Sequence, residues 1–386
     1  ISKQILEQVL RELQPLCTAE QQFIEKFFQL RQDAADPQVL EVSVRTMSSP
    51  VLLASSPPSL SRHKEPTTRL LSELFSCLES ELRGFLDVCN KVHPFGCLQV
   101  LFTLNDSIFE MWDSSSALPS SFLNTVLGNM LLLAKSSFNK CIGTLCKEIE
   151  EVKMPSKMKG GGILPSVSRF EEFVNFSEEV FRTARRRGVL DQAHLKLASS
   201  VFSSINSLSS ANLKVNTDMV MMENFHHIHS FLCQKKIHCL EDKKREAKQK
   251  YSEHMEKYVI KYLGQPLEKL HHFFEGVKAR VAQGVKEEEV SFQLAYSKQE
   301  LRKVIEKYPG KEVNRALETL YRKIHKYLSQ EENLLPVVWH AMEQEFIRQY
   351  REFEDLIQRC YAGSGIAMDF TMEDLLSYFN SITLSN

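Results

Sequence analysis

Four histidines and two cysteines cluster in one segment, and imidazole and thiolate are common zinc ligands. The cluster comprises His226, His227, His229, Cys233, His238 and Cys239. On a helix, His226, His229 and Cys233 would face the same way and could offer three ligands. This face, however, lies about 100° from the apolar stripe that contains Phe225 and Leu232, where imidazoles often sit with a packed body and a wet tip. We interpret the cluster as helix-flanking residues, and a zinc site as the alternative.

A second candidate is the basic triplet Arg185, Arg186 and Arg187, which comes directly before Gly188. The pattern predicts a helix over 168–187 that ends at this glycine, a favoured residue after a helix C-terminus. Cations in a last turn complement the helix dipole at ~0.3–1 kcal/mol each, which is a purely structural role. Contact with a partner or a phosphate group is the functional alternative.

The other motifs do not indicate catalysis. No GxxxxGK[ST], GxSxG or HExxH occurs, so the usual phosphate, acyl-transfer and zinc-protease signatures are missing from the sequence. The glycines at 160–162 lack a preceding strand, which a dinucleotide loop requires. Segment 241–250 carries five positive and three negative charges without aromatic residues, and Glu287 to Glu289 open a predicted helix, so both read as solvated helix positions. The sequence therefore predicts no enzyme, cofactor or small-molecule substrate.

The composition of the chain limits which classes of partner and which cellular compartment are expected. The 386 residues carry a net charge of −1, from 48 basic and 49 acidic residues, so no global charge favours nucleic acid. Nine cysteines without a CxxC pair indicate buried thiols in a reducing compartment. No apolar run reaches the ~18 residues of a membrane span. The chain opens inside a predicted helix at Ile1, from which we expect a C-terminal fragment without a signal peptide.

The clearest element is one helix predicted over 213–262. Its apolar residues recur at steps of three, four and seven, the spacing of one helical stripe, and are Met221, Phe225, Ile228, Leu232, Cys239, Tyr251, Met255, Tyr258 and Tyr262. Such a helix would be ~75 Å long at ~1.5 Å per residue. Its length favours a rod, bundle or coiled coil.

Further helices are predicted on both sides of this one. Their ranges are 1–32 with a break at Pro15, 68–92, 97–112, 119–152, 168–187, 189–210, 267–282, 287–307, 311–329, 332–361 and a short last helix. Thr18 with Gln21, and Thr371 with Asp374, have capping-box spacing. No strand is predicted. Short connections favour antiparallel neighbours, so the fold class is all-α, an elongated rod of consecutive antiparallel helical bundles.

Proline and glycine divide the chain into three predicted domains. Residues 1–153 form the first helical bundle or bundles, with a Ser/Pro-rich loop at 33–67. Residues 154–166 are a linker, 167–264 a second bundle with the long helix, and 265–386 a C-terminal bundle. Within the loop, Ser49 and Ser56 each precede a proline, which suggests proline-directed phosphorylation; an unregulated linker is the alternative.

Several sequence segments, most of them predicted to be helical, resemble the C-terminal region of the exocyst complex component one family. They are LQPLCTAEQQFIEKFF at 13–28, GILPSVSRFEEF at 162–173, VMMENFHHI at 220–228, LGQPLEKLHHFFEG at 263–276, EEEVSFQLAYSKQELRKVIEKYPGKEV at 287–313 and EENLLPVVWHAMEQEFIRQYREFEDLIQRCY at 331–361. The resemblance extends over nearly the whole chain, and the Ser/Pro segment 36–66 matches least.

This resemblance implies a non-enzymatic rod of helical bundles, with other exocyst subunits as partners. The complex tethers secretory vesicles to the plasma membrane, so the implied location is cytoplasmic, with peripheral association at sites of exocytosis. Small GTPases and phosphoinositides would bind an N-terminal domain that no segment of this sequence matches. A direct phosphoinositide- or membrane-binding module, carried by the triplet at 185–187 and the basic residues at 243–250, is the alternative.

Overall fold

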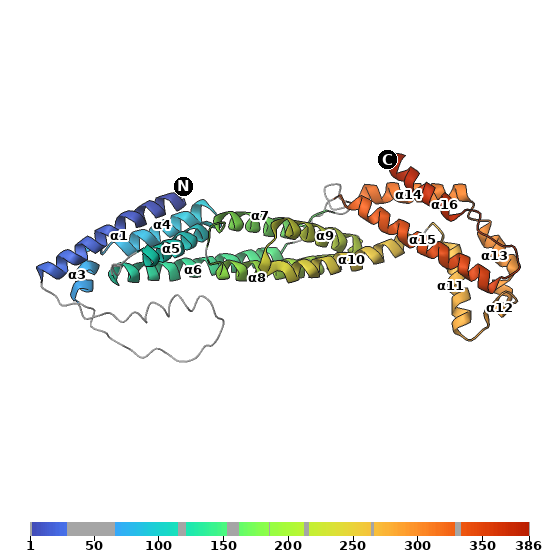
Figure 1. Cartoon of the computed structure of the whole chain (residues 1–386), viewed down its shortest axis with the longest axis horizontal. Coiled ribbons are helices and arrows are strands. Elements are labelled where there is room, and N and C mark those ends of the chain that lie inside the picture. The colour runs from blue at the N-terminus through green and yellow to red at the C-terminus, as the bar shows by residue number, and fades with distance from the viewer. Residues whose placement is uncertain are drawn as a thin grey trace. The chain divides into compact units, whose positions relative to one another are not determined.

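The structure is a computed structural model that describes residues 2–28, 66–114, 121–152, 162–184, 186–211, 216–263, 266–328 and 333–385. These residues form α-helices and two 3-10 helices, with no strand among them (Figure 1). The predicted all-α class is therefore confirmed. Ser49 and Ser56, most of the predicted linker 154–166, and Arg185 lie outside the described residues.

Contacts between residues divide the chain into two compact units. The first unit is Ile1–Val152 with Ser168–Val201, and the second is Lys153–Val167 with Phe202–Asn386. The three-domain division of the sequence stays a prediction, as does the rod shape of the whole chain.

The first unit is a helical bundle with an aromatic core. Its helices are α1 (Ser2–Phe27), α3 (Pro66–Leu74), α4 (Leu78–Val92), α5 (Gly96–Ser114), α6 (Ser121–Glu150), most of α7 (Pro165–Val180) and the first part of α8 (Gly188–Ala211). In the core, the ring of Phe173 lies 5.2 Å from that of Phe95 and 6.5 Å from that of Phe138. These rings join α7 to α6 and to the turn before α5.

Two predicted helix boundaries in this unit were wrong. α1 runs unbroken through Pro15, and the Thr18 hydroxyl donates to the Gln14 carbonyl at 2.8 Å instead of capping a new helix. The predicted helix 68–92 is instead two helices, because a turn at 75–77 separates α3 from α4. Packing supplies a reason for this turn, since the ring of Phe75 stacks on that of Phe122 at 5.8 Å.

The second unit contains the start of α7, the last part of α8, a helical hairpin and a bundle of helices around α15. After α9 (Thr217–Lys235), its elements are the 3-10 helix η1 (His238–Leu240), α10 (Glu241–Leu263), α11 (Glu268–Ala282), α12 (Glu287–Val290), the 3-10 helix η2 (Leu294–Tyr296), α13 (Lys298–Ile305), α14 (Gly310–Tyr327), α15 (Leu334–Cys360) and α16 (Met372–Ser385). Phe346, Phe353 and Trp339 of α15 are buried in one continuous apolar core with residues of α11, α14 and α16.

The single long helix predicted over 213–262 was wrong. Lys236 has φ 52° and ψ 45°, the left-handed conformation that ends helices, and its N–H bonds to the Leu232 carbonyl. The chain then reverses. Asp218 bonds His254 at 2.8 Å, and the Asn216 amide bonds the Tyr262 hydroxyl at 3.3 Å. α9 and α10 are therefore an antiparallel hairpin, in which Tyr251 of α10 meets His226 and His229 of α9, while Phe225 of the predicted stripe packs on Phe202 of α8.

The predicted helix 287–307 was also wrong as one element, because it divides into α12, η2 and α13. The Ser297 hydroxyl caps α13 by accepting from the Glu300 N–H at 3.3 Å. The predicted cap of the last helix is confirmed. The Thr371 N–H donates to Asp374 at 2.9 Å, and the Asp374 N–H donates to the Thr371 hydroxyl at 3.1 Å.

Candidate interaction sites

Arg186 and Arg187 lie before a helix rather than at the end of one. α7 ends at Val180, and Gly188 is the first residue of α8, so the predicted interaction with a helix C-terminus was wrong. A cation near a helix N-terminus is unfavourable by itself. Arg187 is held there by ion pairs with Glu178 and Asp191, whereas the exposed Arg186 lies over the ring of Phe109 at 4.3 Å.

Beside these arginines is a cavity of about 470 Å³ in the first unit. Its walls are formed by Leu101, Phe102, Asn105, Phe181, Arg186, Arg187, Gly188 and Val189. Aromatic and aliphatic walls with an exposed guanidinium suit an acidic or amphipathic group of a partner. The structure thus gives Arg186 an accessible setting, while Arg187 already has carboxylate partners.

A serine, a histidine and a carboxylate also meet in this unit. The Ser177 hydroxyl lies 2.9 Å from His194 Nε2, and His194 Nδ1 lies 3.7 Å from a Glu178 oxygen. This series of contacts, from hydroxyl to imidazole to carboxylate, resembles a hydrolytic triad. However, Ser177 and His194 are both fully buried, and burial lowers the pKa of His194 to about 3. A substrate would not reach this serine, so the group reads as a buried polar contact between α7 and α8.

The histidine cluster is split by the turn after α9. His226 and His229 contact the ring of Tyr251 on α10, with ring centroids 5.3 and 5.8 Å apart. The Cys233 thiol lies 3.6 Å from His229 Nε2, and burial lowers the pKa of His229. His238 belongs to η1, beyond the turn. The rings of His226 and His229 thus pack against α10 within the hairpin, and the interpretation of the whole cluster as helix-flanking residues stays a prediction.

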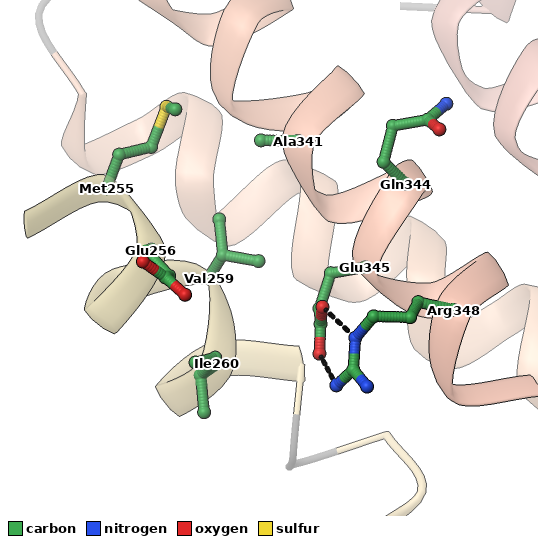
Figure 2. Close-up of a pocket in the computed structure, with 8 residues that line it drawn as sticks. All are labelled: Met255, Glu256, Val259, Ile260, Ala341, Gln344, Glu345 and Arg348. Atoms are coloured by element: carbon green, nitrogen blue, oxygen red, sulfur yellow. Dashed lines mark hydrogen bonds and ion pairs between the residues drawn. The ribbon is translucent and has the colours of Figure 1, made fainter. Parts of the chain in front are cut away.

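A groove lies between α10 and α15 in the second unit (Figure 2). Met255, Val259 and Ile260 come from α10, and Ala341 faces them from α15. They form an apolar floor in a cavity of about 320 Å³. Val259 is buried, whereas Ile260 is half exposed at 50%. The exposed part of this apolar surface is open to a partner side chain.

Charged groups border the groove on its α15 side. Arg348 holds Glu345 through two hydrogen bonds of 2.7 and 2.8 Å (Figure 2). Arg348 also lies 3.3 Å from Glu352, which pairs with Lys278 of α11. The hydrogen bonds from Arg348 hold the pKa of Glu345 below its ordinary value of 4.5. The network fixes one charged edge beside an apolar floor, an arrangement common at protein interfaces.

A polar contact that the sequence analysis did not identify holds the start of α9 against the segment before α7. Asn224 accepts from the Leu164 N–H at 2.8 Å and donates to the Gly162 carbonyl at 3.1 Å. The Gly162 N–H donates to Glu223 at 2.7 Å. Both side chains are fully buried. The sequence did contain a sign of this contact, because an acid and an amide occur inside the apolar run 220–228. Polar side chains that are buried in such a run need hydrogen-bond partners.

Among the helices that the structure describes, none has the length and apolar character of a membrane span. The described residues define an all-α protein whose accessible features are a helical groove and a partly aromatic cavity, both suited to contacts with other macromolecules. Residues 59–363 match the family described as exocyst complex component Sec3, C-terminal. The chain therefore belongs to this family.

Curated relatives agree with this assignment. The chain is 49% identical over 390 residues to exocyst complex component 1 of Mus musculus and 40% identical over 398 residues to that of Drosophila melanogaster. Both alignments cover 99% of this chain, but 43% and 44% of the relatives. Exocyst complex component SEC3A of Arabidopsis thaliana is 24% identical over 310 residues, 80% of this chain and 34% of the relative. The chain thus spans less than half the length of these relatives.

Proposed function

We propose that the chain is a non-enzymatic scaffold of an exocyst subunit, which helps to tether secretory vesicles to the plasma membrane before fusion. The observation that carries this proposal is the family match over 59–363, together with the printed name of the relatives as exocyst components. In this role the helices hold surfaces at fixed positions, and other exocyst subunits bind those surfaces. The chain then acts in the cytoplasm, at the inner face of the plasma membrane.

The groove between α10 and α15 is the proposed contact for another subunit. Its floor of Val259, Ile260 and Ala341 suits an apolar side chain from a partner helix, as in other helix-in-groove complexes. The Glu345–Arg348 pair beside it offers polar contacts at the rim. Apolar burial would then provide affinity, and the charged edge would favour one orientation of the partner helix.

The experiment is co-elution of the chain with purified exocyst subunits, using wild type and Ile260→Arg. The arginine places a charge over the apolar floor, so the expected result is at least a tenfold loss of affinity for the subunit that binds there, or ~1.4 kcal/mol. Val88→Arg is a matched control, because Val88 is 56% exposed on α4 of the first unit. Unchanged binding by Ile260→Arg would remove the groove from the proposal.

Arg186 supports a second, smaller proposal, a contact with an acidic partner group or a phosphate. Its guanidinium is exposed at the cavity beside Phe109, whereas Arg187 serves to hold α7 and α8. Arg185 stays a candidate from the sequence alone. Loss of subunit binding in Arg186→Glu would assign the contact to a protein partner. If the wild type floats with phosphoinositide vesicles and Arg186→Glu does not, the membrane-binding alternative would instead be favoured. If Arg186→Glu changes neither subunit binding nor flotation, the proposed contact at Arg186 is ruled out.

We further propose that small GTPases and membrane lipids contact such a subunit through regions of the longer relatives that this chain does not match. Nucleic acid is not a proposed partner.

A further inference from the structure

The chain between α12 and α13 in the second unit (Figure 1) carries two large apolar side chains at its surface, which we call the apolar tip. They are Phe292, which is 84% exposed, and Leu294, which is 91% exposed. Exposed apolar side chains that occur singly are common on protein surfaces, whereas apolar groups that adjoin one another mark contact sites. The fold thus leaves in water two neighbouring side chains that contribute nothing to its core.

The backbone presents both side chains of the apolar tip on the same side. Gln293, which lies between them, has φ −75° and ψ 135°, an extended conformation. In extended backbone successive side chains point in opposite directions. Phe292 and Leu294 therefore leave the chain together, whereas Gln293 points the other way and is half-buried. One pocket of a partner can accept both apolar groups.

The segment directly before the tip is fixed to the core. Val290 is fully buried in the apolar core of this unit. The Phe292 N–H donates to the Glu289 carbonyl and the Gln293 N–H donates to the Val290 carbonyl, both at 3.1 Å. These two hydrogen bonds close a tight turn that begins at the buried core.

The segment after the tip is fixed as well, through Tyr296. Its carbonyl accepts from the Tyr361 hydroxyl at 2.8 Å, and its ring lies edge-on to that of Phe273, with centroids 5.7 Å apart. Gly276 of α11 leaves room for this ring, because a Cβ there would lie 2.6 Å from a ring carbon of Tyr296. Glycine inside a helix is destabilising relative to alanine, and the docked tyrosine explains its position here.

A tip that is held at both ends loses little freedom when it binds. Ordering of loops and side chains is a main cost of association, and that cost is small for a segment already fixed in its bound conformation. Aromatic side chains are also enriched in the buried centres of protein interfaces. The apolar tip therefore has the properties of an anchor for a partner.

The charges around the tip indicate which class of partner it fits. The charged side chains at 286–298, with their ion-pair partners on α15, are four acids and three bases: Glu287, Glu288, Glu289 and Asp355 against Lys286, Lys298 and Arg359. Anionic membranes attract segments with a basic excess, so these charges favour a protein partner over a membrane. Exposed Glu288 forms no ion pair with the residues that the structure describes, and it can accept from a basic group of that partner.

We propose that the apolar tip inserts into an apolar pocket with a basic rim on another exocyst subunit. The choice of an exocyst subunit as the partner rests on the proposed function. The tip adds a second kind of contact to that function, because the groove between α10 and α15 receives a partner side chain, whereas the tip enters the partner.

Affinities of individually purified exocyst subunits for the immobilised chain test the proposal. The double variant Phe292→Gln with Leu294→Gln makes the tip polar, and at least an about tenfold loss of affinity for one subunit is expected. Neither side chain lies in the core, so thermal stability should not change. Leu132→Gln, at a site that is 64% exposed on α6 of the first unit, is the matched control and should bind as the wild type does.

The outcomes separate the tip from the proposed function. A wild type that binds no subunit would contradict the scaffold function and the tip together. Equal affinities of the wild type and the double variant for every subunit would overturn the tip alone. A loss that Leu132→Gln shares would also overturn it, because exposed apolar surface in general would then be responsible.

Glu288→Lys tests the basic rim. The added positive charge should weaken binding of the same subunit, and by a larger factor at low salt than at high salt, because exposed charges are screened by ions. An affinity that this variant leaves unchanged at low salt would remove the basic rim from the proposal.

Fluorescence of Phe292→Trp locates the contact, measured as the difference from the wild type. On addition of the bound subunit its emission should shift to the blue and acrylamide quenching should fall, because the indole ring leaves water. Leu132→Trp should show neither change. Vesicles of phosphatidylcholine and phosphatidylserine are the second probe. No shift with any subunit, or a shift with vesicles alone, would overturn the proposal, and the latter would assign the tip to a membrane.

Discussion

Asn224 shows how single buried polar groups join distant parts of this chain. Two of the segments that carry the family resemblance are 162–173 and 220–228, and Asn224 links them through hydrogen bonds to Gly162 and Leu164. A third bond, to the Val220 carbonyl at 2.9 Å, stays within α9. Spacing along the sequence does not reveal such a contact, because about sixty residues separate its partners.

Replacing this side chain should be costly. In Asn224→Ala, the Leu164 N–H and the Gly162 carbonyl lose their partner in a buried setting, at about 1–3 kcal/mol for each unsatisfied group. We expect the free energy of unfolding to fall by about 2–4 kcal/mol, measured by urea denaturation, with faster amide exchange at Leu164. Gln249→Ala, which removes an exposed helix contact with Glu253, should change stability by less than ~0.5 kcal/mol. Equal effects in both variants would contradict this account.

The ion pair of Glu345 should make the stability of the folded protein depend on pH. Its hydrogen bonds with Arg348 hold the pKa of the folded carboxyl below 4.5, so the unfolded state takes up the proton at a higher pH than the folded state. The stabilisation is therefore complete well above pH 4.5 and is lost as the pH falls through the folded-state pKa. Glu345→Gln should be less stable at pH 7 and should lose less stability between pH 5 and 3, as followed by urea denaturation with circular dichroism. Identical pH profiles would count against this role of Glu345.

Helix positions were largely predictable at the scale of elements, whereas several helix ends were not. α5, α6, α14 and α15 match their predicted ranges closely, since long amphipathic runs dominate there. The turn at Lys236 was missed because neither glycine nor proline marks it. The start of α13 could have been found, because Ser297 and Glu300 have the spacing of a capping box. The groove was not predictable, since it depends on how α10 packs against α15.

Lys236 allows a direct test of the hairpin. Lysine pays a steric cost in the left-handed conformation that glycine avoids, so Lys236→Gly should raise the free energy of unfolding by up to ~1 kcal/mol. The matched control is Lys248→Gly, at an exposed site inside α10, which should lower it by ~0.5–1 kcal/mol. Chemical denaturation of both variants gives the comparison. If Lys236 lay in one continuous helix, both substitutions would destabilise the protein by similar amounts.

At the scale of the whole molecule, the rod predicted from the sequence can be tested by measuring the radius of gyration. A compact chain of 386 residues would have a radius of gyration of about 21 Å. We expect small-angle X-ray scattering of the monomeric chain to give a clearly larger radius and a long tail in the distance distribution. A value near 21 Å with a symmetric distribution would contradict the rod.

The central claim is that the chain is a scaffold that binds other exocyst subunits, and a pull-down with those purified subunits tests it most directly. Immobilised chain would be offered each subunit at low and at high salt. We expect specific capture of one or two subunits that persists at high salt, because apolar contact in the groove depends little on ionic screening. Capture of no subunit at either salt concentration would contradict the claim that these helices form an assembly surface.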